Sequence, residues 1–484
     1  MLWLALHFRH LPLEVFTRGT RSHTRPLAIT SGAETGATIV AIDRTAQTHG
    51  VRPGMSVSSA CALAAKLELI VRDPAKEQAT LARLAAWSLQ FTSLTSIAEA
   101  DAVLLEIEGS LKLFGGLGKL HQHIARGVAK LGFNVSVACA PTPLAALWFA
   151  RAGTGTRVQH HDALRHALEK LPANVLCDNE TTRDLLESFG ASTLGDCLKL
   201  PRDGLARRAG QHLLDQLDRA LGLRPDPRLP FVAPQTWRAA LPLPAPVTHA
   251  EALLFAAHRL LAELCGWLTA TGHGVQQPIF EFIHEKQIVT IITLDLAQAS
   301  RDLDHLTTLL RERLARTALP CAAIEITVAS GRVVPLVSHN LTFLPDTAGH
   351  TDSASRFVER LNARLGASAI CGLTPHADYR PERAWRTCHP GAANAGENIA
   401  STLMPARPLW LLTTPRALRE ANAAPHDDGP LSLLAGPERI EAGWWDGQHV
   451  ARDYFIARNT AQSLLWVYRE RDLAARWYVH GFFS

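Results

Sequence analysis

The chain has 484 residues and a mass of 52.7 kDa, which at about 150 residues per domain predicts about three folding units and excludes a single small module. Hydrophobic residues make up 47% of the chain and charged residues 19%, which excludes a disordered polymer. The formal net charge of +4 is only mildly basic. Any surface that binds nucleic acid must therefore be a local concentration of basic side chains.

The cysteines and the apolar segments indicate the compartment. The eight cysteines are scattered singly, and no CxxC pair predicts a zinc site or a redox motif, so we expect reduced, mostly packed thiols. The first ten residues, MLWLALHFRH, lack the basic start and the small-residue cleavage site of a signal peptide and are typical of a buried strand. No later apolar run is expected to span a bilayer. The sequence therefore predicts a cytosolic protein.

The N-terminal half has the pattern of a mixed α/β fold. Buried strands are predicted at residues 2–8, 38–42, 102–107 and 134–139. Helical spacing of apolar residues predicts helices at 58–67, 76–91 and 117–130. From residue 180 the chain is predicted to form short helices, each ending at Gly or Pro.

The second half is predicted to begin with a linker and an α+β domain. Many prolines and little periodicity place the linker at 224–246. Beyond it, helices are predicted at 250–270 and 303–316, and strands at 278–283, 287–294 and 323–328. This pattern predicts two helices packed on one small sheet. A helix at 354–365 then precedes a tail with little regular periodicity before residues 453–479.

Four sequence segments carry a resemblance to a known family. GVRPGM (residues 50–55), LEIEGSLKLFGG (105–116) and CAPTPLAAL (139–147), in this order and at these separations, resemble the palm and fingers of Y-family translesion DNA polymerases. FGASTLGDCLKLP (189–201) resembles the helix-hairpin-helix-like element of the thumb, and the α+β unit resembles the little finger. The resemblance covers nearly the whole chain.

The resemblance implies a multidomain fold of α/β and α+β type with a C-terminal extension. We expect the regions to be palm-like at 1–10 and 76–165, fingers-like at 11–75, thumb-like with the helix-hairpin-helix element at 166–235, little-finger-like at 242–336, a linker at 337–350, and a C-terminal partner-binding region at 351–484.

The metal ligands of a polymerase are the next point of comparison. A polymerase needs carboxylates clustered at the ends of palm strands to hold two Mg²⁺ ions. Alignment of the first strand with the family places Ala5 and His7 at two of these positions, and the paired Asp-Glu of the second motif falls on Asp101 and Ala102. Alanine has no ligand atom and imidazole suits Mg²⁺ poorly. One carboxylate therefore remains at the three sites.

The residues that would hold an incoming nucleotide are also replaced. The fingers Tyr and Arg that hold the triphosphate in the family fall on Arg44 and Gln47, and the phosphate-contacting Lys falls on Leu147. Because the metal ligands and the phosphate-binding residues are replaced together, we expect no catalysis, no bound metal and no cofactor.

The two ends of the chain narrow the resemblance. LWLALHF at the start, and RDYFIARN, WVYRERD and WYVHGFFS at the end, resemble the ImuB branch of the family, whose members are non-catalytic and serve damage-induced mutagenesis in bacteria. The resemblance implies a cytoplasmic, nucleoid-associated adaptor of the SOS response. Its implied partners are DNA, the sliding clamp, a RecA-like accessory protein of the ImuA type and an error-prone DnaE-type polymerase.

Clamp binding requires a short extended peptide with a polar head and two apolar anchors. A segment of that shape lies between the little-finger-like region and the tail and consists of Asn340, Leu341, Thr342, Phe343 and Leu344. The alternative is a loop whose apolar anchors are buried. Gln462 to Trp466 is a rival segment, but its surroundings are typical of a packed strand.

Sequence-independent DNA contact is expected in the thumb-like region. Backbone amides near Leu194 and Gly195 and the side chains of Arg202, Arg207 and Arg208 could neutralise phosphates without reading bases. A solvated helix face is the alternative. Three nearby histidines, His160, His161 and His166, lack metal-ligand spacing and are interpreted as a surface cluster.

The tail is rich in tryptophan. Its tryptophans are Trp385, Trp410, Trp444, Trp445, Trp466 and Trp477, and we expect core packing to explain most of them. The run D-x-R-P-E-R-A-W contains Arg380, Glu382, Arg383 and Trp385. By resemblance, this tail is where partners are recognised.

Two other functions stay open from the sequence. The first is an active translesion polymerase that uses substitute carboxylates such as Asp43, Glu99 or Asp101. The second is a plain DNA-binding protein without affinity for the clamp.

Overall fold

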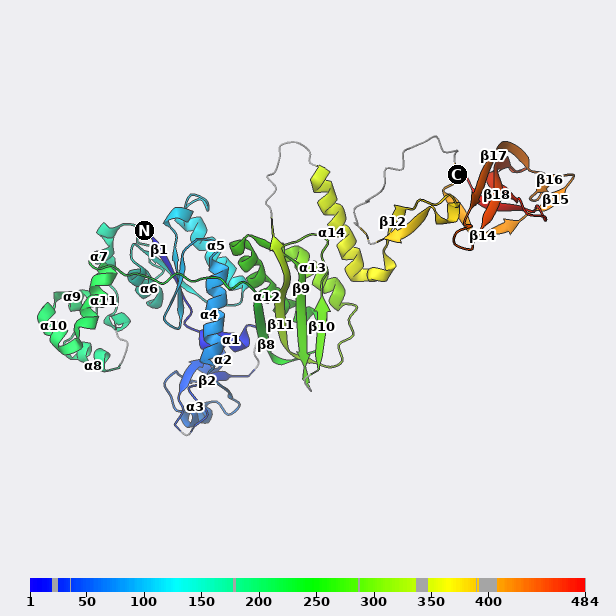
Figure 1. The fold of residues 1–484 in the computed structure, drawn as a ribbon. Helices are drawn as coiled ribbons and strands as arrows, with labels where there is room; N and C mark the ends of the chain where they lie inside the picture. The colour runs from blue at the N-terminus through cyan, green and yellow to red at the C-terminus, as the bar shows by residue number, and fades with distance from the viewer. Residues whose placement is uncertain are drawn as a thin grey trace. The chain divides into compact units, whose positions relative to one another are not determined.

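The computed structural model describes residues 1–19, 25–34, 36–176, 180–285, 288–336, 347–388, 390 and 407–483. The chain divides into two compact units, Met1–Arg364 and Leu365–Ser484 (Figure 1). The division lies at the end of a helix, whereas the sequence analysis starts the C-terminal region at residue 351.

The palm-like region is built on a four-stranded antiparallel sheet in the order β5-β6-β1-β7. Its strands are β1 (Trp3–His7), β5 (Thr95–Ala98), β6 (Ala102–Glu106) and β7 (Ser136–Ala140). All five residues of β1 are buried, because the strand lies between β6 and β7 and both faces of the sheet are covered. The predicted buried strand at the start of the chain is confirmed.

Alternate side chains of β1 enter two different hydrophobic clusters, as the two-residue period of a strand requires. Leu4 and Leu6 pack with apolar side chains of α4 (Pro74–Ser88) and α5 (Leu117–Lys130). Ala5 belongs to the cluster that contains α6 (Pro143–Arg151), which packs on β1 and β7. The predicted helix at 117–130 is confirmed.

The fingers-like region contains a three-stranded sheet in the order β3-β2-β4. Its elements are α1 (Leu11–Thr17), β2 (Leu27–Thr30), β3 (Ile39–Ile42), α2 (Arg44–Thr48), α3 (Val57–Leu63) and β4 (Glu68–Val71). The small cores of this region are made mainly of Ala, Ile and Leu.

The thumb-like region is helical, as predicted. Its helices are α7 (His161–Glu169), α8 (Glu180–Ser188), α9 (Leu194–Lys199), α10 (Arg202–Ala209) and α11 (Gln211–Leu221). Leu213, Leu214 and Leu217 of α11 share the hydrophobic cluster of α6, so the thumb-like helices continue the core beneath the palm-like sheet.

The little-finger-like region confirms the prediction of two helices on one small sheet (Figure 1). Its strands follow the order β10-β9-β11-β8. The elements are β8 (Arg238–Val247), α12 (Ala250–Thr271), β9 (His273–His284), β10 (Val289–Thr293), α13 (Leu303–Leu314) and β11 (Ala323–Pro335).

The linker predicted at 224–246 is wrong over its second part, because β8 starts at Arg238 and pairs with β11. Prolines caused the error: β8 contains Pro242, Pro244 and Pro246. Proline cannot donate to a strand ladder, but it is tolerated on an edge strand, and β8 is the edge of its sheet.

Among the described residues, helix α12 is long and apolar enough to cross a bilayer, contrary to the expectation from the sequence. However, 72% of its most apolar window is buried inside the protein. The helix packs on α4, α13 and the sheet, which accounts for its apolar surface.

A buried ion network joins α1, α4 and α12. The Glu263 carboxylate of α12 accepts from Arg18, just after α1, and from the Nε of Arg83 on α4 at 3.1 Å. The side chains of Arg18 and Glu263 are each 1% exposed. Helices α4 and α12 also approach closely, because a Cβ on Gly266 would lie 2.1 Å from the Trp87 ring. The little-finger-like sheet is thus fixed to the palm-like helices.

Helix α14 (Thr347–Leu365) is attached to the little-finger-like region by charged groups. Arg356 pairs with Asp302 at 2.8 Å, and the buried Glu359 lies 2.7 Å from the Nε2 of His305. Glu359 also accepts from the backbone amide of Ala297 at 2.7 Å.

The C-terminal unit is built from strands. Its five-stranded antiparallel sheet has the order β14-β20-β19-β18-β17, and two strand pairs are separate from it. The strands are β12 (Gly372–Pro375), β13 (Trp385–Cys388), β14 (Trp410–Ala417), β15 (Arg419–Ala421), β16 (Ala424–His426), β17 (Ser432–Ala442), β18 (Val450–Arg458), β19 (Leu464–Glu470) and β20 (Trp477–Phe482).

Strands form in the tail before residue 453, although its sequence has little regular periodicity there. The earlier strands are largely exposed, so their sequences lack the alternation of apolar residues that marks a half-buried strand. The expectation that core packing explains most of the tail tryptophans is wrong. Trp466 and Trp477 are buried, whereas four others are more than half exposed, namely Trp385, Trp410, Trp444 and Trp445.

We expect Glu263→Ala to lower the free energy of unfolding by about 3–5 kcal/mol, because it leaves the buried Arg18 without its partner. The matched control is Glu68→Ala, which removes a carboxylate from an exposed pair with Arg25 and should cost at most about 1 kcal/mol. Urea unfolding of the full chain measures both. Equal costs for the two variants would show that the buried network does not hold the regions together.

Candidate functional site

Three positions at which the sequence predicts that polymerase residues are replaced lie in the same apolar cluster. Ala5 of β1, Ala102 of β6 and Leu147 of α6 are each fully buried and belong to one hydrophobic cluster. The cluster also contains Leu104 and Ala138. A carboxylate at Ala5 or Ala102 would enter this apolar interior, where an unpaired charge is strongly disfavoured. The space in which metal ligands were expected is filled by side-chain carbon.

The polar rim of this cluster is made of ion pairs. Asp101, predicted from the sequence to be the one retained carboxylate, lies 3.3 Å from the Nε2 of His7 and 2.9 Å from the Nη2 of Arg151. The same Arg151 nitrogen also pairs with Glu99. The Arg151 guanidinium is therefore shared by the two carboxylates.

These contacts set the charge of the rim. Burial by itself favours the neutral form of Asp101, but the hydrogen bond from His7 and the charge and hydrogen bond of Arg151 outweigh burial and lower the pKa of Asp101. Burial likewise opposes the charge on Arg151, and Glu99 and Asp101 outweigh it and raise the pKa of Arg151. Asp101 and Arg151 are thus both favoured in their charged forms, and one arginine is shared by two carboxylates.

A pocket of about 360 Å³ opens beside the rim and is lined by His7, Arg72, Glu77, Glu99 and Asp101, among others. The carboxylate of Glu77 is bound by both Arg72 Nε and Arg72 Nη2 at 2.8 Å. Over the described part of the chain, no group of three or more His, Cys, Asp or Glu side chains is arranged to hold a metal ion. Each carboxylate of this pocket has an arginine partner.

The fingers-like positions lie outside this pocket. Arg44 and Gln47 are exposed on the short helix α2. Asp43, a candidate substitute carboxylate, caps that helix: its Oδ1 accepts from Ala46 N at 2.7 Å and from Leu27 N at 3.1 Å. The Asp43 carboxylate therefore stabilises the start of α2 and its contact with β2.

In the thumb-like region, the hairpin residues are already engaged. Leu194 and Gly195 are buried, and the Leu194 amide donates to the Leu171 carbonyl at 2.8 Å. The next turn is closed by a capping box between Thr193 and Asp196. In this conformation, the Leu194 amide is not available to a phosphate.

The three thumb-like arginines differ in their surroundings. Arg202 is held by both carboxylate oxygens of Asp218, at 2.9 and 2.7 Å. Arg207 and Arg208 are exposed on α10, and the Arg208 guanidinium lies over the Phe189 ring at 5.4 Å. Of the predicted side chains, Arg207 and Arg208 are the better placed to meet a phosphate.

The predicted clamp-binding peptide, Asn340 to Leu344, lies outside the described residues. Its rival can be placed. Gln462 has a positive φ of 66° in the turn before β19, and Leu465 and Trp466 are buried in the sheet. Residues 462–466 therefore form a turn and the start of strand β19, which is packed in the sheet, rather than a free peptide.

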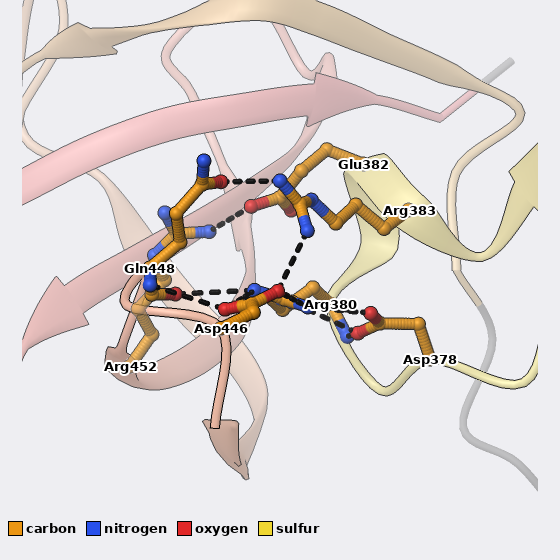
Figure 2. A network of polar contacts seen from close by, with 7 residues as sticks. All are labelled: Asp378, Arg380, Glu382, Arg383, Asp446, Gln448 and Arg452. Atoms are coloured by element: carbon orange, nitrogen blue, oxygen red, sulfur yellow. Dashed lines mark hydrogen bonds and ion pairs between the residues drawn. The ribbon is translucent and has the colours of Figure 1, made fainter. Parts of the chain in front are cut away.

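The D-x-R-P-E-R-A-W run forms an internal network in the C-terminal unit, and Figure 2 shows Arg380 and Arg383 reaching the loop that carries Asp446 and Gln448. Arg380 is only 2% exposed and bonds both Asp378 and Asp446, each at 2.7 Å through Nη2. Hydrogen bonds from Arg380 lower the pKa of Asp446 to about 2. Arg383 reaches the same Asp446 at 2.8 Å.

The remainder of the run extends the network to the sheet. Glu382 accepts from Arg452 of β18 at 3.0 Å, and Arg452 also donates to the Tyr454 hydroxyl at 3.2 Å. The arginines and the glutamate of the run therefore fix one part of this unit to another. The exposed residues beside them are aromatic: Trp385 in the run, and the edge-to-face pair Trp444 and Trp445 in the loop.

Comparison with known proteins gives three findings. Residues 17–151 match the impB/mucB/samB family. Protein ImuB of Caulobacter vibrioides is 27% identical over 462 residues, which cover 90% of this chain and 100% of the relative. Among solved structures, an insertion ternary complex of Dbh DNA polymerase covers 68% of this chain and 98% of its own at 15% identity and a TM-score of 0.40. DinB from Sulfolobus solfataricus has the same coverage at 16% identity and a TM-score of 0.38.

The resemblance to the ImuB branch of the Y-family is confirmed. The predicted mixture of α/β and α+β regions with a C-terminal extension is also confirmed. The family match starts at residue 17, so strand β1 of this ImuB-like chain, with Ala5 and His7, lies outside it.

Sequence reasoning missed one residue of the ImuB-like palm rim. Arg151, the last residue of α6, pairs with Glu99 and Asp101, about 50 positions away in the chain. Arginine is common at the C-terminal end of a helix, so its presence there does not by itself indicate a functional residue. The sequence pattern also does not show which carboxylates Arg151 will contact. Only the crossing of α6 behind β1 brings the groups together.

The apolar filling of the palm-like cluster can be tested with Ala5→Asp. We expect this change to lower the free energy of unfolding by about 3–5 kcal/mol, the cost of an uncompensated buried charge. Ala100→Asp makes the same chemical change at an exposed rim position and should alter stability by at most about 0.5 kcal/mol. Urea unfolding with and without Mg²⁺ is the measurement. An Ala5→Asp chain that Mg²⁺ stabilises would indicate a working metal site.

The C-terminal network leads to a second prediction. We expect Arg380→Ala to accelerate amide hydrogen exchange in residues 443–449, because Arg380 bonds the Asp446 carboxylate and the Gln448 carbonyl. Arg439→Ala removes a similar bidentate pair with Asp453 on the surface and should leave that loop unchanged. Mass spectrometry of peptides from both variants measures the exchange. Equal exchange of residues 443–449 in the two variants would contradict the role of Arg380 in holding this loop.

Proposed function

We propose that this chain is a non-catalytic adaptor in damage-induced mutagenesis. In this proposal it links DNA and the sliding clamp to a RecA-like accessory protein of the ImuA type and to an error-prone DnaE-type polymerase, in the bacterial cytoplasm. The similarity to ImuB over 90% of the chain supports the role, and the arrangement of the palm-like region supports the absence of catalysis.

One observation carries the non-catalytic part of the proposal. Positions that hold metal ions and phosphate in an active relative are represented here by Ala5, Ala102 and Leu147, which lie together in one buried apolar cluster. Nucleotidyl transfer depends on two metal ions that stabilise the attacking and leaving oxygens. A site without room for charged ligands at these positions does not supply that stabilisation.

The rival polymerase function has weaker support. Of its three substitute carboxylates, Asp43 caps α2, while Glu99 and Asp101 share Arg151. Binding a metal ion at the rim would require Arg151 to leave both carboxylates. No described contact favours that exchange.

The two units suit different partners. Residues 365–484 contain twelve Arg, no Lys and twelve Asp or Glu, so the whole net charge of +4 resides in residues 1–364. DNA contact through Arg207 and Arg208 is therefore proposed for the first unit. The neutral second unit, with arginine and exposed tryptophan, has the composition of a protein interface, and we assign to it the recognition of the protein partners.

Primer extension tests the absence of catalysis. We expect the purified chain to give no template-dependent incorporation with Mg²⁺ or with Mn²⁺, because its only retained palm carboxylate is neutralised by Arg151. An active Y-family polymerase serves as the positive control for the assay. Incorporation that disappears in Asp101→Ala would establish the rival function and overturn the proposal.

Clamp binding is tested separately. We expect Leu341→Ala combined with Phe343→Ala to weaken binding to the clamp by at least about tenfold, since apolar anchors dominate such peptides. Leu464→Ala, in the rival segment, is the matched control and should leave the affinity unchanged. Surface plasmon resonance with immobilised clamp measures all three chains. Loss of binding only in Leu464→Ala would reassign the peptide, and no binding by any chain would favour a plain DNA-binding protein.

A further inference from the structure

A basic hollow lies where the palm-like region joins the thumb-like helices. It has a volume of about 590 Å³ and lies between residues 154–160 and helix α7. Its ionisable lining side chains are Arg157, His160, His166 and Lys170. Among the described residues no carboxylate lines it, so every titratable group that they place around the space is basic.

One wall of the hollow is fixed to the palm-like sheet. Cys139 of β7 donates its amide to the Thr156 carbonyl, and the Val158 amide donates to the Cys139 carbonyl, both at 2.9 Å. Residue 157 lies between these two bonds and forms a parallel bridge with Cys139. The backbone beneath Arg157 is therefore held in place although its side chain is exposed.

The opposite wall is one face of α7. Ala163, His166, Ala167 and Lys170 follow the helical spacing i, i+3, i+4, i+7 and line the hollow. Leu164, on the other side of the helix, is 1% exposed and anchors it in the palm cluster. The two alanines leave space between the basic side chains.

The positive charges of the hollow are not neutralised locally. Within the described part of the chain, no carboxylate lies within 4.0 Å of Arg157 or Lys170. Arg165, on the same helix but outside the hollow, pairs with Glu169 at 3.2 Å. Unpaired cations around a concave space favour an anion there.

The position of the hollow suggests the source of the anion. The hollow ends at Lys170 and Leu171, and the Leu171 carbonyl accepts from Leu194 at the start of the predicted hairpin element. The backbone of Glu169 also touches this element, because a Cβ on Gly195 would lie 3.0 Å from the Glu169 carbonyl oxygen. A nucleic-acid backbone that follows the thumb-like helices would thus pass beside the hollow.

We propose that the hollow binds a backbone phosphate of DNA, through Arg157 and Lys170 with His160 and His166 beside them. The inference rests on the DNA contact of the proposed function and adds a site for it outside α10. Because the groups are flexible cations facing a phosphate, the contact is independent of base sequence.

Salt dependence of DNA binding tests the site. Anisotropy of a labelled duplex with the full chain gives the slope of log affinity against log salt, which falls by about one for each phosphate that the protein no longer neutralises. We expect Arg157→Gln combined with Lys170→Gln to lower the slope by one to two and to weaken binding equally for unrelated sequences. Arg165→Gln removes one charge from the same helix and should leave the slope unchanged.

The outcomes separate the hollow from the proposed function. If the double variant leaves the affinity and the salt slope unchanged, the proposal that the hollow binds a phosphate is overturned, and the proposed function is not. An equal change of the slope in Arg165→Gln would have the same meaning. A chain that binds no duplex at all would overturn the DNA contact of the proposed function together with the hollow.

Lysine footprinting of the unaltered chain identifies the source of the phosphate. We expect duplex DNA to protect Lys170 from acetylation while the exposed Lys119 of α5 stays reactive. Protection by inorganic phosphate or by a deoxynucleoside triphosphate, without protection by duplex, would show a small-anion site and overturn the assignment to DNA.

Discussion

The arrangement of the first unit depends on the ion pairs of the buried Glu263 carboxylate. Its two arginine partners come from the end of α1 and from α4, and α12 supplies the glutamate, so a single group joins three regions of the chain. An ion network this deeply buried is favourable only while every member is paired. Trp87 and Gly266 also bring α4 and α12 into close contact. The little-finger-like region is therefore positioned by burial and charge together, not by its connecting segment alone.

A second use of charge appears at the palm-like rim. In the interior, alanine and leucine side chains fill the space between β1, β6 and α6, and at its edge Arg151 pairs with both Glu99 and Asp101. Carbon therefore fills the interior of the cluster, and the carboxylates at its edge share an arginine as their partner.

The two units divide their surface chemistry. The first has the basic excess, part of which lies on the thumb-like helix α10 and around the hollow beside α7. The second is electrically neutral and presents exposed tryptophans next to arginines that are already committed to internal bonds. The charged members of the D-x-R-P-E-R-A-W run are thus engaged in internal bonds, whereas the aromatic residues beside them are exposed.

The sequence by itself determined the buried first strand, the helix at 117–130, the two helices of the little-finger-like region and the family resemblance, because apolar period and local motifs are properties of short segments. It also predicted, one by one, that Ala5, Ala102 and Leu147 stand at replaced positions. Only the tertiary structure decided that these three share one core, that Arg151 reaches Asp101, that the prolines of β8 lie on a sheet edge, and that Arg380 points inward. Each of these depends on segments far apart in the chain, whose meeting no local pattern records.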